Sequence, residues 1–480
     1  MGTPPLSPWA VLVLTLVLLG LWAPCVVSRR PNFIVILADD VGWGDLGANW
    51  AETKETPRLD QLAAEGTRFV DFHSAASTCS PSRASLLTGR LGVRNGVTHN
   101  FAISSLGGLP LNETTLAEVL REAGYSTGAI GKWHLGHHGR HHPNSRGFDY
   151  YFGIPYSHDM GCTDSPGYNV PPCPPCPRHS TAARYGAPLP AGWRGRTVTQ
   201  RLPCLSSRTS PSSSSPWSWA AWPGATRRRQ SASSRGPGDN GPWAQKCELA
   251  GRLGPFVGAW QRQRGGSSAK QTTWEGGHRV PALVYWPGRV PARRTSHALL
   301  SILDIFPTLV ALAGAALPPN RRFDGLDVSP VLFGWSDVGH KVLLHPNSGA
   351  AGKVGEIEAL RLAQYKAFYT TGGAMACDGS TGPAQQHQPP LIFNLDRDIQ
   401  EQEPLDVASR EYQAVLPAIS RAYAQALQDI AADNVSVADY SQDPAAIPCC
   451  NVQHVGCRCH GALGATRDPH GETRTPRLCL

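Results

Sequence analysis

Four short blocks of this 480-residue sequence combine residue types that can carry out chemistry together. They are Asp39-Asp40, Cys79 to Gly89 (CSPSRASLLTG), Gly124 to His134 (GYSTGAIGKWH), and Asp239-Asn240 with the later Lys270 and Trp274 to Gly277 (WEGG). Carboxylate and amide oxygens are hard ligands, so the first and last blocks predict a calcium or magnesium site rather than a zinc site. Cationic side chains suit a tetrahedral oxyanion, and a histidine can move a proton. The candidates for these two roles are Arg83, Lys132, Lys270 and His134.

Each candidate also has a purely structural interpretation. A lone cysteine is more often a small buried hydrophobe or a disulfide partner, and an aspartate pair can be a turn or a helix cap. For Cys79 and Asp39-Asp40 we favour the functional interpretation because several blocks occur together. The histidines after His134 could suggest zinc, but we favour exposed loop histidines. Lys270 and Ser157 depend on shorter sequence context, and the alternative for both is an ordinary surface residue.

The elements around the blocks predict an α/β protein. The run Asn32 to Ala38 (NFIVILA) is apolar without alternation, which is typical of a strand buried on both faces of a parallel sheet. It ends at Asp39-Asp40, and ligands gather at the carboxyl ends of such strands. Helices are predicted for Thr56 to Gly66 and for Thr115 to Ala123, and a strand for Gly124 to Gly131.

The pattern continues from Trp274 to the end of the last helix. We expect a strand at Val280 to Trp286 and a helical pattern at Ala298 to Ala313, interrupted by Pro307. Strands of a smaller sheet are predicted at Lys366 to Thr371 and Leu391 to Asn394, and an amphipathic helix at Tyr412 to Ala432.

The segment from Arg178 to Gly238 does not fit this pattern. It holds ten arginines, no lysine and no acidic residue, and it is rich in Ser, Pro, Gly and Trp. It is either a linker or insertion or, as we slightly favour, the translation of a wrong reading frame or an intron. Without its arginines the chain carries 34 basic and 36 acidic residues, so the formal net charge of +8 says little about the substrate. We expect no nucleic-acid partner.

Several features predict entry into the secretory pathway. Ala10 to Trp22 is an apolar run of signal-peptide length, and small residues favour cleavage after Ser28. The run is short for a bilayer, so we expect no membrane span. Sequons at Asn112 and Asn434 predict glycosylation.

The 13 cysteines suit an oxidising compartment. Cys173 and Cys176 could form a redox pair, although structural disulfides involving Cys162 fit a secreted chain better. Without Cys25, Cys79 and the out-of-pattern Cys204 and Cys479, nine remain. This odd number suggests that one disulfide partner is missing.

At the four blocks the chain resembles the sulfatase family, and within it the arylsulfatases. The resemblance covers Pro31 to about Pro177 and Asp239 to about Cys459. It implies an alkaline-phosphatase-like fold: a large mixed sheet flanked by helices, with a smaller C-terminal antiparallel-sheet subdomain.

The resemblance also implies a mechanism. Cys79 would be oxidised to formylglycine (3-oxoalanine) by the formylglycine-generating enzyme, which would recognise Pro81 and Arg83. One hydroxyl of the aldehyde hydrate would attack sulfur, and the other would expel sulfate. One Ca²⁺ would be held by Asp39, Asp40, Asp239, Asn240 and the modified Cys79. Arg83 would orient the hydrate, His134 would hydrogen-bond the eliminating hydroxyl, and Lys132, Lys270 and Ser157 would contact sulfate.

The anomalous segment departs from the family pattern. The family has two buried strands there, one of which carries a histidine that protonates the leaving oxygen, and no residue here takes that role. Burying Arg227 to Arg229 in a central strand would be costly. The alternative to an active sulfatase is therefore a non-catalytic or misfolded secreted glycoprotein; a phosphatase of the same broad fold is a third hypothesis.

The resemblance further implies a division of the chain and a setting. We expect a lysosomal or extracellular enzyme that acts on sulfated carbohydrates, such as the glycosaminoglycan heparan sulfate. The predicted parts are a signal peptide (1–28), the first part of the catalytic domain (29–177), the anomalous segment (178–238), the rest of the catalytic domain (239–340), a smaller subdomain (341–460) and a loose tail (461–480).

Overall fold

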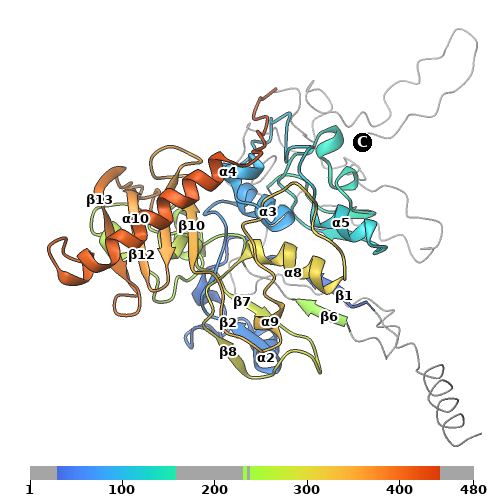
Figure 1. The fold of residues 1–480 in the computed structure, drawn as a ribbon, viewed down its shortest axis with the longest axis horizontal. Coiled ribbons are helices and arrows are strands. Elements are labelled where there is room, and N and C mark those ends of the chain that lie inside the picture. Colours follow the sequence, from blue (N-terminus) through green and yellow to red (C-terminus); the bar gives the residue numbers. More distant parts are fainter. Residues whose placement is uncertain (1–29, 158–230, 235–237, 444–480) are drawn as a thin grey trace, which may run out of the picture.

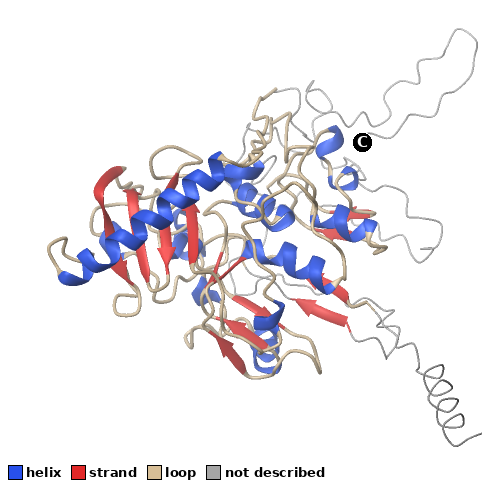
Figure 2. Ribbon diagram, viewed as in Figure 1, coloured by secondary structure: helices blue, strands red, loops and turns tan. Residues whose placement is uncertain are grey.

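The computed structural model describes residues 30–157, 231–234 and 238–443, and the predicted signal peptide and tail lie outside these ranges. Figures 1 and 2 show a sheet with a long helix across it on one side of the molecule, and a larger mixed α/β part on the other side. The strands are β1 (Asn32–Val35), β2 (Thr67–Phe69), β3 (Phe72–His73), β4 (Gly128–Ile130), β5 (Tyr150–Phe152), β6 (Ser231–Ser234), β7 (Ala282–Val284), β8 (Arg294–Ser296), β9 (Leu300–Ser301), β10 (Val342–Pro346), β11 (Ile357–Leu362), β12 (Tyr365–Thr371) and β13 (Gln385–Asn394). The α-helices are α2 (Pro57–Glu65), α3 (Cys79–Thr88), α4 (Gly92–Asn95), α5 (Leu116–Glu122), α6 (Ala259–Arg262), α7 (Glu275–His278), α8 (Ile305–Leu312), α9 (Ser329–Leu332) and α10 (Arg410–Ala431).

The mixed part contains both parallel and antiparallel strand pairs, as the predicted fold class requires. The pairs β1–β6, β2–β8, β3–β9 and β4–β5 are parallel, and β7 runs antiparallel to β2. Helices such as α3 and α8 follow strands in the chain and pack on a common apolar core with them. Within the described residues the strands are paired in several short groups rather than in one continuous ladder.

Two expectations about β1 were wrong. The strand is shorter than Asn32 to Ala38, and its residues alternate between exposed and half-buried, with Ile34 49% exposed. Among the described residues, β1 pairs with one strand, β6. Part of the surface of β1 is therefore exposed.

The anomalous segment contains one strand that was not predicted. β6 uses Ser231–Ser234, which follow the arginine triplet in sequence and precede Asp239. The parallel alignment with β1 continues to a bridge between Ala38 and Gly238. The rest of the anomalous segment lies outside the described residues.

The predicted helices are largely confirmed. Thr115 caps α5 with a capping box to Glu118, and Gly124 follows the helix with φ +86°. The helical pattern from Ala298 was too long, because the chain first forms β9 and a 3-10 turn. The helix α8 begins only at Ile305, and Pro307 lies in its first turn, where a missing N–H is tolerated.

The smaller sheet is antiparallel, in the order β10-β11-β12-β13, and α10 packs across one face (Figure 1). Its other face meets the mixed part through an aromatic core around Trp274 and Phe368. A buried carboxylate, Glu275, is bound there by Lys366 at 2.9 Å and Arg279 at 2.7 Å. This ion network therefore links β12 to the WEGG run, which follows shortly after Lys270 in the sequence.

Candidate active site

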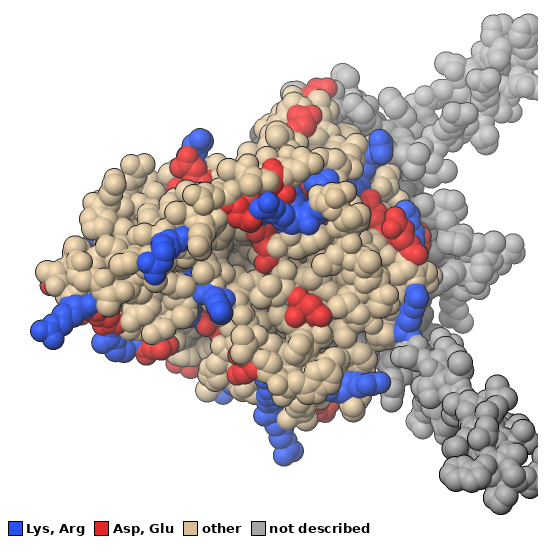
Figure 3. Space-filling view, in the orientation of Figure 1, with Lys and Arg blue, Asp and Glu red and all other residues tan. Residues whose placement is uncertain are grey.

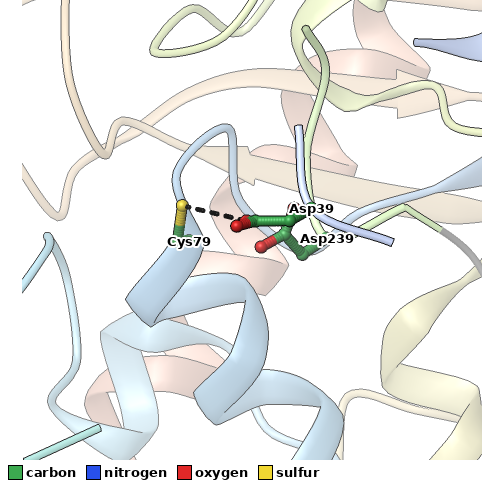
Figure 4. Close-up of side chains that lie close together, drawn as sticks. All are labelled: Asp39, Cys79 and Asp239. Carbon is green, nitrogen blue, oxygen red and sulfur yellow. Dashed lines mark hydrogen bonds between the residues drawn. The ribbon is translucent and has the colours of Figure 1, made fainter. Parts of the chain in front are cut away.

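Cys79 is the first residue of α3 and lies 1% exposed against the strand ends. Every residue of α3 is buried, and the helix ends at Gly89, whose φ of +66° suits glycine. The N-terminus of a helix favours negative charge, so this position stabilises an anion formed at residue 79. Figure 4 shows the Cys79 side chain directed toward Asp39 and Asp239.

Two ammonium groups flank the Cys79 sulfur. Sγ lies 3.1 Å from Nζ of Lys132 and 3.4 Å from Nζ of Lys270. Burial raises the pKa of the Cys79 thiol to about 12, although both lysines act in the opposite direction. Burial alone would lower the pKa values of the two lysines, but nearby ionisable groups, Cys79 first and then Asp39 for Lys132 and Asp40 for Lys270, raise both pKa values, so the lysines remain cationic. The arrangement thus surrounds one reactive position with fixed positive charge.

The carboxylates of three aspartates converge on the same place. Lys132 contacts Asp39 at 2.9 Å, and Lys270 contacts Asp40 at 2.6 Å. Arg83 holds the third, donating from Nε to Asp239 at 2.9 Å and from Nη2 to Asp39 at 3.2 Å. Asp40 has φ +54°, a left-handed conformation that costs free energy for a residue with a Cβ, as is often found at functional sites.

Burial raises the pKa of Asp239 to about 6, with Arg83 opposing and Asp39 and Asp40 reinforcing the rise. Asp39, Cys79 and Asp239 each offer one ligand atom, and these atoms lie within 4.8 Å of one another. Another expected ligand, Asn240, is fully buried, and its Oδ1 has no hydrogen-bond donor in the described part of the chain. A hard divalent cation would satisfy that oxygen and relieve the crowded carboxylates, so the residues present fit calcium.

His134 lies close to the start of α3. Its Nε2 is 3.0 Å from the carbonyl oxygen of Phe101, and its own carbonyl accepts from Ser80 Oγ at 2.7 Å. A carbonyl only accepts, so Nε2 carries the proton, and Nδ1 holds the lone pair in the neutral ring. His134 is thereby oriented as a proton acceptor through Nδ1. Its φ of +60° marks another left-handed residue at the site.

Further residues support the site, and the sequence analysis did not identify them. Asn100 accepts a 2.8 Å hydrogen bond from the backbone N–H of Ser80. Ser348, from the loop after β10, shares a 3.0 Å hydrogen bond with Ser77, and the backbone N–H of Gln271 donates to the Ser77 carbonyl at 2.8 Å. No local motif marks these residues, because the contacts join distant parts of the chain.

Ser157 is buried, two residues after Pro155, whose carbonyl accepts from the backbone N–H of His134 at 3.0 Å. Its contact with sulfate stays a prediction. The sequon asparagines Asn112 and Asn434 are both exposed. Ser436 of the second sequon donates to Glu113 of the first at 2.6 Å, so the two sequons are neighbours.

Three cysteines lie in the described residues. Cys79 is free, whereas Cys247 and Cys377 form a disulfide. Cys162, Cys173 and Cys176 lie outside the described residues. No helix in the described ranges is long and apolar enough to cross a membrane. Figure 3 shows basic and acidic side chains interspersed on the face in view rather than gathered by sign.

A second group with metal-ligand spacing in the described residues is Asp71, His73 and Glu275. Its carboxylates are already ion-paired with Arg279 and Arg361, so we interpret it as structural. Neither of these two groups of the described residues includes a histidine from the stretch His134 to His142.

The fold and the site together define a hydrolase of the sulfatase class. The sulfatase family model matches residues 31–195 and 238–315, and a model of the C-terminal region of aryl-sulfatase matches residues 338–459. The chain therefore belongs to the sulfatase family and is a sulfuric ester hydrolase. The first match is interrupted within the segment that the sequence analysis found anomalous.

Individual relatives support this family assignment. The chain is 58% identical to arylsulfatase G of Homo sapiens, over 91% of this chain and 94% of that protein. It is 36% identical to arylsulfatase A of Homo sapiens, over 94% of this chain and 98% of that protein. Among solved structures, the PsFucS1 sulfatase from Pseudoalteromonas sp. has a TM-score of 0.63 at 23% identity, covering 90% of this chain and 97% of that one, which supports the fold.

Proposed function

We propose that this chain is a formylglycine-dependent, calcium-assisted sulfatase whose nucleophile derives from Cys79. The observation that carries the proposal is the position of Cys79 Sγ, between the ammonium groups of Lys132 and Lys270 and facing the Asp39 carboxylate at 3.8 Å. A plain thiol with a pKa near 12 would be a poor nucleophile in this place. The surroundings suit an oxygen nucleophile and a sulfate dianion much better.

The proposed reaction proceeds through a covalent sulfate ester. One hydroxyl of the hydrated aldehyde at residue 79 attacks sulfur, the bond to the substrate oxygen breaks, and the alcohol leaves with a proton. The second hydroxyl then loses its proton, the carbonyl double bond re-forms, and sulfate is expelled. Water adds to the aldehyde and restores the hydrate, so the cycle balances without any external oxidant or reductant.

The chain's own residues supply positioning and charge. Nδ1 of His134 accepts the proton of the eliminating hydroxyl, because Nε2 is committed to Phe101. Lys132 and Lys270 hold the sulfate oxygens, and Ser157 contributes a further contact. Arg83 fixes Asp39 and Asp239. Since these donors are buried and already in place, little reorganisation accompanies the reaction.

Calcium would be held by Asp39, Asp40, Asp239 and Asn240 together with residue 79, and when bound it would lower the pKa of the hydroxyl nucleophile and stabilise anionic oxygen. The orphaned Oδ1 of Asn240 supports this assignment.

Maturation requires a partner, the formylglycine-generating enzyme. All ten residues of α3 are buried in the folded chain. The recognition residues Cys79, Pro81 and Arg83 are therefore accessible only before this part of the chain folds. This favours modification in the endoplasmic reticulum during secretion, as the predicted signal peptide and the sequons Asn112 and Asn434 require.

We propose sulfated carbohydrates, and glycosaminoglycans such as heparan sulfate, as the substrates, and the lysosome or the extracellular space as the location. The relatives include an N-acetylgalactosamine-6-sulfatase of Canis lupus familiaris, 34% identical over 82% of this chain and 85% of that protein. We also propose that the parts of the chain predicted from the sequence end at residues 177, 238, 340 and 460.

The test is to express this exact chain together with the generating enzyme and to assay an aryl sulfate at acidic pH. We expect turnover by the natural chain and none by Cys79→Ala. Mass spectrometry should show the aldehyde at residue 79. Absence of turnover in both proteins would support the non-catalytic alternative, and faster cleavage of an aryl phosphate would support the phosphatase hypothesis.

A further inference from the structure

We propose that the hydroxyl of Ser80 is a positioning group for His134 and thereby sets the rate at which sulfate is expelled in the second half of the reaction. This role rests on the proposed function, in which Nδ1 of His134 accepts the proton of the eliminating hydroxyl. It gives a task to a residue that lies outside the predicted nucleophile, metal and sulfate-binding sets, and outside the modification pattern of Cys79, Pro81 and Arg83.

Three hydrogen bonds join Ser80 and His134 into a closed circuit through Phe101. The Ser80 hydroxyl donates to the His134 carbonyl at 2.7 Å and accepts from the Phe101 backbone N–H at 3.3 Å. The Phe101 carbonyl in turn lies 3.0 Å from Nε2 of the His134 ring. One hydroxyl therefore holds the histidine twice, at its backbone directly and at its ring through Phe101.

His134 requires this support because of its backbone conformation. Its φ of +60° is left-handed, which costs free energy for a residue with a Cβ and persists only when surrounding contacts enforce it. The His134 N–H donates to the Pro155 carbonyl at 3.0 Å, and the bond from Ser80 restrains the carbonyl on the other side of the same residue. Without the Ser80 hydroxyl we expect the backbone to relax and the ring to leave its position.

The restraint begins next to the nucleophile. Ser80 is covalently bonded to residue 79, and its backbone N–H donates to Oδ1 of Asn100 at 2.8 Å. Ser80 is fully buried and His134 is 2% exposed, so water does not compete for these hydrogen bonds. Nucleophile and proton acceptor are thus separated by one peptide bond and one hydrogen bond. A displacement of about 1 Å in such a pair can cost roughly a hundredfold in rate.

The other two serines of α3 differ from Ser80 in one respect. Ser80, Ser82 and Ser85 are all 0% exposed. The hydroxyls of Ser82 and Ser85 have no hydrogen-bond partner in the described part of the chain, whereas the Ser80 hydroxyl has two. Small size accounts for the first two in a fully buried helix, and only Ser80 uses its hydroxyl in directed bonds. Ser85→Ala is therefore a matched control for Ser80→Ala.

The test combines steady-state kinetics on an aryl sulfate with intact-mass spectrometry during turnover, and rates are divided by the aldehyde content at residue 79. If elimination becomes slower than attack, kcat and KM fall together and kcat/KM is unchanged, because kcat/KM reports only the steps up to the covalent ester. We expect Ser80→Ala to lower kcat and KM by about ten- to a hundredfold, since a displaced base loses part of its contribution to proton transfer. Most modified molecules should then carry one sulfate. Ser85→Ala should match the natural chain.

A double-mutant cycle tests whether Ser80 acts through His134. His134→Ala alone should also slow elimination and leave sulfate on residue 79. Adding Ser80→Ala to His134→Ala should not lower kcat further, because the side chain that the hydroxyl positions is already absent. Two effects that multiply would mean that Ser80 acts on another group, and would overturn the positioning role.

Loss of kcat/KM without accumulated sulfate in Ser80→Ala would also overturn the role, because a purely structural defect has that signature. Sulfate is counted per modified molecule, so a lower yield of folded protein does not affect this readout. If Ser80→Ala does not fold, Asn100→Ala removes a half-buried side chain that holds the Ser80 N–H, and the same signature and criteria apply to it. A natural chain that does not cleave the aryl sulfate would refute the proposed function itself, whereas an active natural chain with no sulfate on the variant would refute only the role of Ser80.

Discussion

The backbone N–H of Asp40 donates a 3.0 Å hydrogen bond to Oδ1 of Asp239, a residue 199 positions later in the sequence. The contact forms because Ala38 and Gly238, one residue before each metal-site block, pair in parallel. Arg83 then closes the group by bonding to Oδ2 of Asp239 and Oδ1 of Asp39. The two halves of the candidate metal site are thus assembled by the backbone and bridged by one guanidinium.

Arg83 is the first residue to test. Its replacement by alanine leaves Asp239 buried without its guanidinium partner, so we expect the free energy of unfolding to fall by about 3–5 kcal/mol. Urea denaturation would measure this change. Because Arg83 also belongs to the modification pattern, the comparison should use Cys79→Ala as the parent, so that both proteins lack the aldehyde.

Arg83→Lys is the matched control. It keeps the charge but loses the planar fork that reaches Asp239, Asp39 and the Lys132 carbonyl together. We expect it to recover only part of the lost stability. Full recovery would mean that charge alone, and not the directed hydrogen bonds, holds the site.

Calcium should stabilise the folded chain without being needed for folding. Lys132, Lys270 and Arg83 pair with the aspartates and balance part of their negative charge. At a calcium concentration one hundred times Kd, we expect a gain of about 2.7 kcal/mol in the free energy of unfolding. Thermal unfolding with calcium and with a chelator would measure it. The gain should shrink in Asn240→Ala, and an equal gain in that variant would remove Asn240 from the ligand set.

The α/β class, the smaller antiparallel sheet and most helices could be predicted, because local apolar periodicity and caps determine them. The Thr115 cap with Glu118 and the apolar spacing of Tyr365–Thr371 are signals of this kind. The structure also brings together residues that the sequence motifs predicted for the site: Asp39, Asp40, Cys79, Arg83, Lys132, Asp239, Asn240 and Lys270.

Long-range contacts could not be predicted. Ser348 reaches Ser77 across 271 residues, and no local pattern encodes such a pairing. The strand β6 was missed because its serines lack apolar character; its parallel pairing with β1 gives it its place.

Serine in place of Cys79 should separate the two halves of the reaction. Cys79→Ser supplies one hydroxyl to attack sulfur but no second hydroxyl to expel sulfate. We therefore expect a single turnover and a stable sulfate ester on residue 79, seen as a mass increase of one sulfate group by intact-mass spectrometry. Continued turnover by Cys79→Ser would contradict the elimination step. Cys79→Ala should acquire no such mass.

Glu358 on β11 is a buried carboxyl that the mechanism does not use. It is 2% exposed, and neither oxygen has a hydrogen-bond donor among the described residues. Its carboxyl lies so close to Gly352 that a Cβ there would be 2.2 Å from Oε1. Burial, reinforced by the charge of Glu356, raises the pKa of Glu358 to about 8, and Tyr423 is the other titratable side chain that senses its charge.

This raised pKa predicts a pH-dependent stability that favours acid. The ordinary glutamate pKa is 4.5, so between pH 4.5 and 8 the folded chain keeps a proton on Glu358 that the unfolded chain has lost. The resulting stability is fully present below pH 4.5 and disappears as pH rises through 8, with a slope of about 1.4 kcal/mol per pH unit at most. Glu358→Gln, which stays neutral, should remove that slope in urea unfolding at pH 5, 6.5 and 8. Glu356→Gln, at an exposed neighbour paired with Lys353, should keep most of it; an unchanged slope in Glu358→Gln would show that another group is responsible.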